Sequence, residues 1–531
     1  MIPTTVRQWM RSRIVLVTFC ALLVGSFILF SWLKQEPVFF DGDPFYHAKV
    51  AQLMIERGNI IKEFPWMPGS ILEQTYIDHH FLYHAVLIPF ILATGDPLVA
   101  IRIASIFFAS MLIACFYLFL RSCSVRLPLL YTLILFASQS FITRVNLDRA
   151  PAASLLVLLL WLYALMRKKH TLLFCVSFFY VWFYNAWPLA FVASFLWCTT
   201  NAAIHNRLFD VRMYASFAVC TSGLLTGIII NPYFPVNIIF FKTLFLSIVI
   251  FTQGVAFGIG EEWFPASPLS FIQSNIMFGI LYLCAVSWSL ACIMRSRNAI
   301  SSSLSHTVLF FGSFSILLFL ATVKSQRMAE YFIPIGTCFI ALSLSDLLPR
   351  RSLFKEAAAR IAGTQFIPLK IVGSMACMVA FTYMLVMHIE AYQSLYAYTT
   401  HHTRFSFRSM QNLGEYMKRA VPTNSIVATN DWSFFSQLFY YADHYRYLWG
   451  LDPTLTHDMN PKRYDTLYSL MARNTGGESA AEILRTEFNA SYLIIAKQDG
   501  APQGVFPAAI AKNKSFKKLY EDEDALLYAI P

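Results

Sequence analysis

Long apolar runs separated by short polar stretches recur along the first 390 residues of this 531-residue chain. A helix needs roughly 17–25 mostly apolar residues to cross the hydrocarbon of a bilayer. Eleven runs approach or reach that length: 14–33, 98–120, 127–143, 150–166, 171–184, 186–203, 212–230, 272–294, 305–323, 329–348 and 369–388. The pattern therefore predicts a polytopic α-helical membrane protein with about eleven transmembrane helices.

The charges between these runs alternate in sign from one connection to the next. Basic residues gather at 7–13, 121–126, 167–169, 207–212, 295–297 and 350–370, whereas acidic residues gather in the connections between those. Basic loops stay on the cytoplasmic side of a membrane protein. We therefore expect a cytoplasmic N-terminus and three outer loops on the non-cytoplasmic side, at 34–97, 144–149 and 231–271.

Two further apolar stretches, Phe81–Thr94 and Val236–Phe257, must lie outside the spans for this alternation to hold. The first is short, and the second carries Lys242 and Gln253. Both are interpreted as helices at the outer interface. Counting both as spans is the alternative. It keeps the overall parity but places the charged segment 144–149 on the inside.

The tail differs from the rest of the chain because it is polar, mixed in composition and of domain size. Residues 424–428, 491–496 and 525–530 have strand-like patterns, and 394–419 has a helical one. The sequence thus predicts a transmembrane domain over 1–388 and an exported α/β domain over 389–531.

Composition agrees with a membrane protein, since 57% of the residues are hydrophobic and only 13% are charged. Soluble domains carry about 25% charged residues. The net charge of +11 does not indicate nucleic-acid binding, because the basic residues form short clusters between apolar runs. The first run is longer than a signal-peptide core and is expected to stay uncleaved. None of the ten cysteines lies in 36–96 or after 388, so the exported parts hold no intrachain disulfide.

The first outer loop begins with two carboxylates, Asp41 and Asp43, followed by Pro44. Pro44 fits the first turn of a helix, which makes Asp43 the predicted N-cap. A capped interfacial helix is the simplest interpretation of this segment. The alternative is that the two acids contribute to a site for chemistry.

Further charged residues at span boundaries favour a site on the same side. Asp148 and Glu262 are costly at such positions unless they are paired or bind a metal. With Asp43 they would suit Mg²⁺ or Mn²⁺, which prefer oxygen ligands. Arg327 at the head of a span suits a phosphate, although an ion pair with Glu330 is the simpler interpretation.

The order of these motifs resembles the catalytic subunit of oligosaccharyltransferases, within the GT-C class of polyprenyl-phosphate-dependent glycosyltransferases. The resemblance covers about the first 390 residues and extends more weakly into the tail. Its motifs are Asp41-Gly42-Asp43-Pro44-Phe45-Tyr46, the stretch from Ile142 to Asp148, Glu262-Trp263-Phe264-Pro265, and Arg327 ahead of Tyr331-Phe332.

This resemblance implies a GT-C fold and transfer of a sugar or oligosaccharide from a polyprenyl phosphate or pyrophosphate to an exported protein or glycan. It implies catalytic roles for Asp43, Glu262 and Asp148, and a divalent cation, Mn or Mg, held by these residues and His80. The substrate-binding residues that it implies are Asp41, Tyr46, His79, Arg149, Arg327, Tyr331, Asp431 and Trp432. The lipid bilayer would be a partner and nucleic acid would not, and the expected location is a bacterial inner membrane.

The chain departs from the family pattern at two places. Ala150 stands where the second motif usually has another acid, so a metal ligand is missing or is replaced by His79 or His80. The Trp-Trp-Asp-Tyr-Gly motif that reads a glycosylation sequon is absent, and Asn430-Asp431-Trp432 is the nearest stretch. Two alternatives stay open at this point: a transporter or lipid flippase, and a lipid-binding relative without catalysis.

Overall fold

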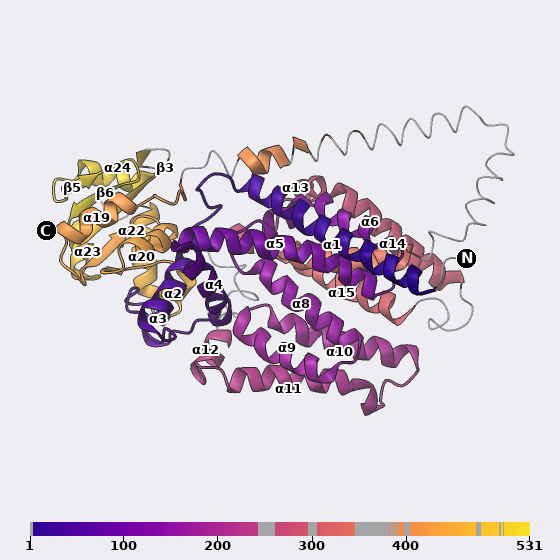
Figure 1. Ribbon diagram of the computed structural model, residues 1–531. Coiled ribbons are helices and arrows are strands. Elements are labelled where there is room, and N and C mark those ends of the chain that lie inside the picture. The colour runs from indigo at the N-terminus through magenta and orange to yellow at the C-terminus, as the bar shows by residue number, and fades with distance from the viewer. Residues whose placement is uncertain are drawn as a thin grey trace.

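A computed structural model of the chain describes residues 4–242, 261–295, 305–345, 382, 386, 389–390, 392–397, 404–473, 479–498, 501–502 and 504–531. Its helices form an elongated bundle, and a smaller domain with a sheet packs at one end of it (Figure 1). The N-terminus lies toward the other end of the bundle (Figure 1). The predicted span 369–388 and the apolar stretch 243–257 fall wholly or mostly outside the described residues.

Within the described residues, seven helical segments are long and apolar enough to cross a membrane. They lie in α1 (Thr4–Leu33), α5 (Pro97–Ser122), α10 (Trp187–Ile204), η2 (Val211–Tyr214) with α11 (Ala215–Ile229), α14 (Ile276–Arg295), α15 (His306–Lys324), and η7 (Gln326–Met328) with α16 (Ala329–Leu344). Each coincides with a predicted span to within a few residues. The prediction of a polytopic helical membrane protein is confirmed.

Three other predicted spans are helical but are not straight, full-length crossings. Span 127–143 consists of α6 (Pro128–Leu133), η1 (Ile134–Ala137) and α7 (Gln139–Val145), with an 85° bend before α7. The bend follows from Ser138, which starts a new helix by accepting a hydrogen bond from the amide of Phe141 at 3.2 Å.

The other two, α8 (Pro151–Met166) and α9 (His170–Phe183), have 16 and 14 residues. At 1.5 Å per residue they reach only about 24 and 21 Å. The hydrocarbon core is about 30 Å thick, so both helices are shorter than a straight crossing at full thickness.

The connection between α1 and α5 forms the short helices α2 (Asp43–Arg57), α3 (Ile71–Gln74) and α4 (Phe81–Thr94). The bounds of α4 are those of the predicted interfacial helix. Ten of the fifteen residues of α2 are buried, because it packs against α4, α5 and α20 (Phe435–Tyr441). The described part of the second interfacial stretch is α12 (Val236–Lys242).

The C-terminal domain is an α/β fold, as predicted. Its sheet has the order β2-β1-β3-β6-β5, in which β1 pairs in parallel with β2 and β3, β6 is antiparallel to β3 and β5, and β4 pairs with β3. The strands are β1 (Ile426–Thr429), β2 (Arg446–Tyr447), β3 (Tyr492–Gln498), β4 (Ala501–Pro502), β5 (Lys517–Glu521) and β6 (Ala525–Ala529). The helices are α19 (Gln411–Ala420), η8 (Trp432–Phe434), α20, α21 (Pro453–His457), α22 (Pro461–Arg473), α23 (Ala480–Thr486) and α24 (Val505–Lys512).

The predicted helix 394–419 is only partly correct, because residues 404–410 form turns ahead of α19. The backbone of this segment bonds to the α1–α2 connection as well as within its own turns. The amide of Phe39 donates to the carbonyl of Phe405 at 2.9 Å, and the amide of Phe407 donates to the carbonyl of Pro37 at 2.8 Å. These bonds tie the C-terminal domain to the end of α1.

Helices α9 and α11 pack closely because α11 carries Gly223 and Gly227 one turn apart. A Cβ at Gly223 would lie 2.6 Å from the carbonyl oxygen of Phe174, and one at Gly227 would lie 2.6 Å from that of Phe178. Small residues at this spacing let the backbones of two membrane helices approach. A larger residue at either position requires the two helices to move apart.

Candidate active site

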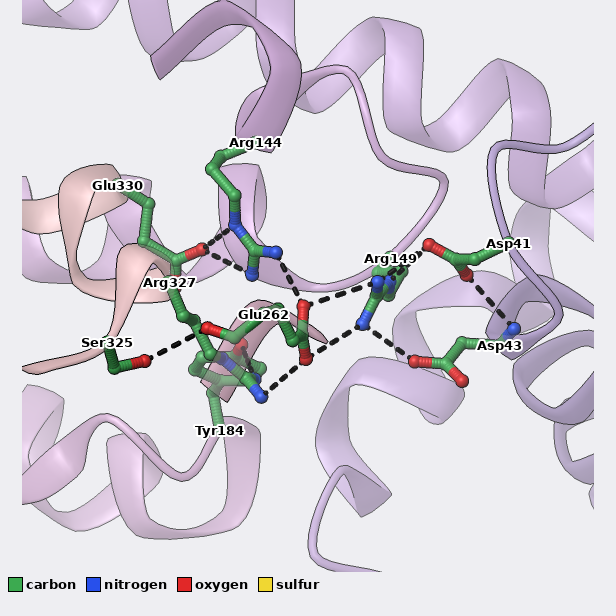
Figure 2. Close-up of polar contacts among 9 residues, drawn as sticks. All are labelled: Asp41, Asp43, Arg144, Arg149, Tyr184, Glu262, Ser325, Arg327 and Glu330. Atoms are coloured by element: carbon green, nitrogen blue, oxygen red, sulfur yellow. Dashed lines mark hydrogen bonds and ion pairs between the residues drawn. The ribbon is translucent and has the colours of Figure 1, made fainter. Parts of the chain in front are cut away.

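A cavity of about 820 Å³ lies where the helix ends meet the C-terminal domain. Its walls come from the α1–α2 connection, the start of α4, the α7–α8 connection, η5 (Glu261–Trp263), η7 and η8. These segments are far apart in sequence, and several of them contribute a charged side chain. Figure 2 shows the arginines and carboxylates that meet there.

Asp41 and Asp43 enter the cavity from the α1–α2 connection. The N-cap of α2 is Gly42, and the Asp41 carboxylate accepts a hydrogen bond from the amide of Asp43 at 3.0 Å. The prediction of Asp43 as the N-cap is therefore wrong, because Asp43 is already the first helical residue. Its side chain is 45% exposed, and its Oδ2 pairs with Nη1 of Arg149 at 2.7 Å.

Arg149 is the centre of the charged cluster (Figure 2). Its Nη2 lies 2.6 Å from Oδ2 of Asp41 and 3.4 Å from Oε2 of Glu262, in addition to the contact with Asp43. It stands in the α7–α8 connection, one residue after Asp148. Burial raises the pKa of Asp41 to about 6, although the guanidinium of Arg149 opposes this shift.

Glu262 receives three guanidinium groups. Nη1 of Arg144 lies 2.6 Å from Oε2, Nη1 of Arg327 lies 3.0 Å from Oε1, and Arg149 contacts Oε2. Burial alone raises the pKa of Glu262, but the arginines outweigh it and hold the pKa well below its usual range. Glu262 is thus a fixed anion that orients positive charge, and it is a poor proton acceptor.

Arg327 lies at the cavity wall with further partners of its own. Its Nη2 donates to the hydroxyl of Tyr184 at 2.6 Å, and the guanidinium lies 4.7 Å from the ring centre of Trp263. The alternative interpretation, an ion pair of Arg327 with Glu330, is not what the structure shows, because Glu330 is buried beside Arg144 at 2.9 Å. Arg327 therefore keeps donor capacity facing the cavity.

Asp148 does not line the cavity. Its carboxylate is 3% exposed and pairs with Nζ of Lys34 at 2.9 Å and with Nε of Arg102 at 3.4 Å. Ser105 also donates to it. Burial lowers the pKa of Lys34 to about 8, although Asp148 opposes the shift. The structure does not bring Asp148 into the cavity with Asp43 and Glu262, because its oxygens are directed to these partners inside the bundle.

Four histidines lie beside the cavity, and His47, His79 and His80 line it. Nδ1 of His84 lies 2.7 Å from Oδ2 of buried Asp78, and its Nε2 lies 2.7 Å from Nδ1 of His47. Burial lowers the pKa of His79 to about 4 and the pKa values of His47 and His80 well below the usual range. These three imidazoles are therefore neutral near pH 7.

The remaining predicted binding residues divide into two groups. Tyr46 and Trp432 line the cavity, as do Asp41, His79, Arg149 and Arg327. Tyr331 and Asp431 do not. Tyr331 is buried inside the bundle, and Asp431 pairs with Arg404 at 2.6 Å and caps η8. The structure therefore does not bring Tyr331 and Asp431 together with the other predicted binding residues.

The described residues do not fit the expected divalent cation. They contain no group of three or more His, Cys, Asp or Glu side chains arranged to hold a metal ion. Asp43 and Glu262 are paired with arginines, Asp148 is paired inside the bundle, and Ala150 brings no ligand. His80 lines the cavity with its Nε2 buried and without a hydrogen-bond partner, but it belongs to no group of three such side chains among the described residues.

Neither a family model nor a curated protein sequence matches this chain. Solved structures are similar to it over nearly its whole length. The archaeal oligosaccharyltransferase AglB from Archaeoglobus fulgidus, in complex with an inhibitory peptide and a dolichol-phosphate, has a TM-score of 0.64 at 12% identity and covers 97% of this chain and 74% of its own. ArnT from Cupriavidus metallidurans, bound to undecaprenyl phosphate, has a TM-score of 0.52 at 13% identity and covers 97% and 98%.

The chain has the GT-C fold. An Archaeoglobus fulgidus oligosaccharyltransferase in complex with Zn and sulfate shares it, with a TM-score of 0.58 at 12% identity over 96% of this chain and 73% of that one. The GT-C fold expected from the sequence motifs is confirmed. At this level of identity the similarity concerns the fold, and the chemistry has to be argued from the cavity.

Sequence reasoning missed several polar residues in and near the cavity. Arg144 is one of them, although it stands in a motif that was recognised, and its two acidic partners are 118 and 186 residues away. Tyr184, which ends the apolar run 171–184, is another cavity residue that was missed. Lys34, which follows the run 14–33, was missed as the partner of Asp148 inside the bundle. A polar residue that ends a span next to an acidic loop is the signal that would have pointed to them.

Proposed function

We propose that this protein is a membrane glycosyltransferase that moves a sugar or oligosaccharide from a polyprenyl phosphate or pyrophosphate to an acceptor. The observation that carries the proposal is the cavity, in a GT-C fold, where Asp43 pairs with Arg149. Arg149 and Arg327 both contact Glu262, so the carboxylate of Asp43 and the two guanidinium groups belong to one network. Guanidinium groups bind phosphate through paired donors. A half-exposed carboxylate beside them suits a proton acceptor.

In the proposed reaction, an oxygen or nitrogen of the acceptor attacks the anomeric carbon of the donor. The bond from that carbon to the phosphate oxygen breaks, and the lipid phosphate leaves with the electron pair. Asp43 accepts the acceptor's proton, and Arg327 with Arg149 stabilises the negative charge on the leaving phosphate. Glu262 and Tyr184 hold Arg327 in place.

The proposed donor follows from the fold and the charge of the cavity. AglB is solved with a dolichol-phosphate and ArnT with undecaprenyl phosphate, and both have this fold. The arginines give the cavity wall groups that bind a phosphate. We expect the cavity to face the non-cytoplasmic side of a bacterial plasma membrane, because the basic connections lie on the opposite side of the spans.

The proposed acceptor is an exported protein or glycan that reaches the cavity along the C-terminal domain. Trp432 and Ser433 line the cavity from η8, directly after β1. Without the Trp-Trp-Asp-Tyr-Gly motif, this region lacks the groups that the family uses to read a sequon. An asparagine in such a sequon is therefore not the acceptor that we propose.

A transporter or lipid flippase is the competing function. Transporters bind their substrates near the bilayer midplane, at broken helices. Here the charges lie at the ends of helices: Asp43 begins α2, Arg149 precedes α8 and Arg327 precedes α16. This placement favours a reaction at one face of the membrane.

Mass analysis of lipid extracts from cells that lack the protein tests the proposal. Loss of a transferase leaves its polyprenyl-linked glycan in the outer leaflet, where a membrane-impermeant oxidant such as periodate modifies it in intact cells. Loss of a flippase leaves the same lipid in the inner leaflet, protected from the oxidant. Accumulation of a protected lipid, or no accumulation, would contradict the transferase.

A further inference from the structure

Arg149 occupies the position among the carboxylates that a bound cation would need. Its guanidinium contacts Asp41 at 2.6 Å, Asp43 at 2.7 Å and Glu262 at 3.4 Å. These acids come from the α1–α2 connection, the start of α2 and η5, so the arginine joins three separate segments (Figure 2). Its own side chain is only 13% exposed. Linking acids from separate segments is also what a divalent cation does in a carboxylate site.

The charges of the cluster are already nearly balanced. Arg144, Arg149 and Arg327 face Asp41, Asp43, Glu262 and Glu330, three positive groups against four negative ones (Figure 2). A divalent cation on Asp43 and Glu262 would have to displace Arg149 from both. It would then lie next to a buried guanidinium that had lost two of its three partners. Like charges at such a distance repel strongly where water is scarce.

No other acid in the described part of the cavity replaces the missing ligands. Asp452 also lines the cavity, but its Oδ1 caps α21 by accepting hydrogen bonds from the amide and the hydroxyl of Thr454 at 2.9 and 2.7 Å. Ala150 lies where the family pattern has an acid, and Asp148 is paired with Lys34 away from the cavity. Glu330 is fully buried against Arg144. The chain thus lacks an acid at position 150, and at the neighbouring position 149 it has an arginine that pairs with the acids that remain.

We infer that Arg149 takes the place of the divalent cation, so that this chain catalyses glycosyl transfer without a metal. The reaction in this inference rests on the proposed function. The replacement of a cation by a guanidinium rests on the ion pairs of the cluster. Arg149 holds Asp43 at the entrance of α2 and, together with Arg327, supplies positive charge for the leaving phosphate. The fixed charge is in place before the donor binds.

The experiment uses the full-length protein in lipid nanodiscs after exhaustive dialysis against EDTA. Binding of Mn²⁺ is followed by electron paramagnetic resonance, and turnover is followed as consumption of the polyprenyl-linked glycan that accumulates in cells lacking the protein. The wild-type protein should bind no stoichiometric Mn²⁺ at the cavity, and its turnover in EDTA should equal its turnover in Mn²⁺. Stoichiometric Mn²⁺ in the wild type, or turnover that EDTA abolishes and Mn²⁺ restores, would overturn the inference.

Arg149→Met tests the exchange directly, because it frees three carboxylates while keeping an apolar stem of similar length. This variant should bind Mn²⁺ that the wild type does not bind, and it should turn over about 100-fold more slowly or worse in EDTA. Arg212→Met, at an exposed arginine far along the chain, is the matched control and should behave as the wild type. If Arg149→Met does not fold, the wild-type Mn²⁺ measurement still decides. Mn²⁺ binding needs no substrate, so failure of the proposed reaction and failure of the metal exchange give different results.

Discussion

Asp43→Asn separates a catalytic carboxylate from a structural one. Asp43 is the most exposed acid of the cluster at 45%, and it makes one ion pair with Arg149. Exposed ion pairs contribute about 0–1 kcal/mol, so the free energy of unfolding should fall by no more than about 1 kcal/mol. The first helical position does not depend on this carboxylate, since Asp41 bonds to the amide of Asp43.

The effect on the reaction should be much larger than the effect on stability. An amide cannot accept the proton of the acceptor, and general-base catalysis contributes about 10²–10⁴ in rate. The variant should therefore turn over at least about 100-fold more slowly, which corresponds to about 2.7 kcal/mol in the activation barrier. Its binding of the polyprenyl donor should be retained, because Arg327 keeps Glu262 and Tyr184 as partners.

The assay is complementation of cells lacking the protein, with the accumulated lipid-linked glycan measured by mass analysis and the thermal stability of each purified variant measured beside it. Asp96→Asn is the matched control, because Asp96 caps α5 at an exposed position and asparagine caps nearly as well. Asp41→Asn should lose much less activity than Asp43→Asn. Equal and mild losses at Asp41 and Asp43, with both proteins folded, would refute Asp43 as the proton acceptor and favour the transporter.

Three further predictions concern stability, topology and acceptor choice. Asp148→Asn should lower the free energy of unfolding by about 3 kcal/mol, because it leaves Lys34 and Arg102 buried without their anion; an inactive variant with wild-type thermal stability would place Asp148 in the reaction after all. A reporter fused after His388 should be exported and one fused after Arg360 should stay cytoplasmic, and the same location for both would invalidate the assignment of eleven spans. A peptide with an Asn-x-Thr sequon should not be the preferred acceptor of the purified protein, and its efficient glycosylation in a mass-spectrometric assay would show that another part of the C-terminal domain reads the sequon.

The helices could be placed from the sequence because the length of an apolar run is a local property. The expected span 98–120 corresponds to Pro97–Ser122, and the expected strand 491–496 corresponds to Tyr492–Gln498. The helix α2 was expected at the membrane interface because its pattern is amphipathic. It is buried because the C-terminal domain covers it, and even its Lys49 pairs with Asp443 at 2.8 Å.

The pairing of charges could not be predicted in the same way. Asp148 and Lys34 are 114 residues apart; Asp148 was predicted as a metal ligand, and Lys34 was not singled out. Which acid faces the cavity and which faces the bundle depends on the course of the α7–α8 connection, which is not helical at Asp148, and the sequence pattern does not resolve that course. The same uncertainty hid the central position of Arg149, the residue next to Asp148.

The close approach of α9 and α11 has a consequence for how natural variants and random mutant libraries of this protein should be interpreted. Gly223 touches the backbone of α9, and α9 ends one residue before Tyr184, whose hydroxyl binds Arg327. A valine at position 223 would push α9 aside and move Tyr184 with it. Loss-of-function screens should therefore identify Gly223 together with the cavity residues, although it lies on a lipid-embedded helix and meets neither donor nor acceptor.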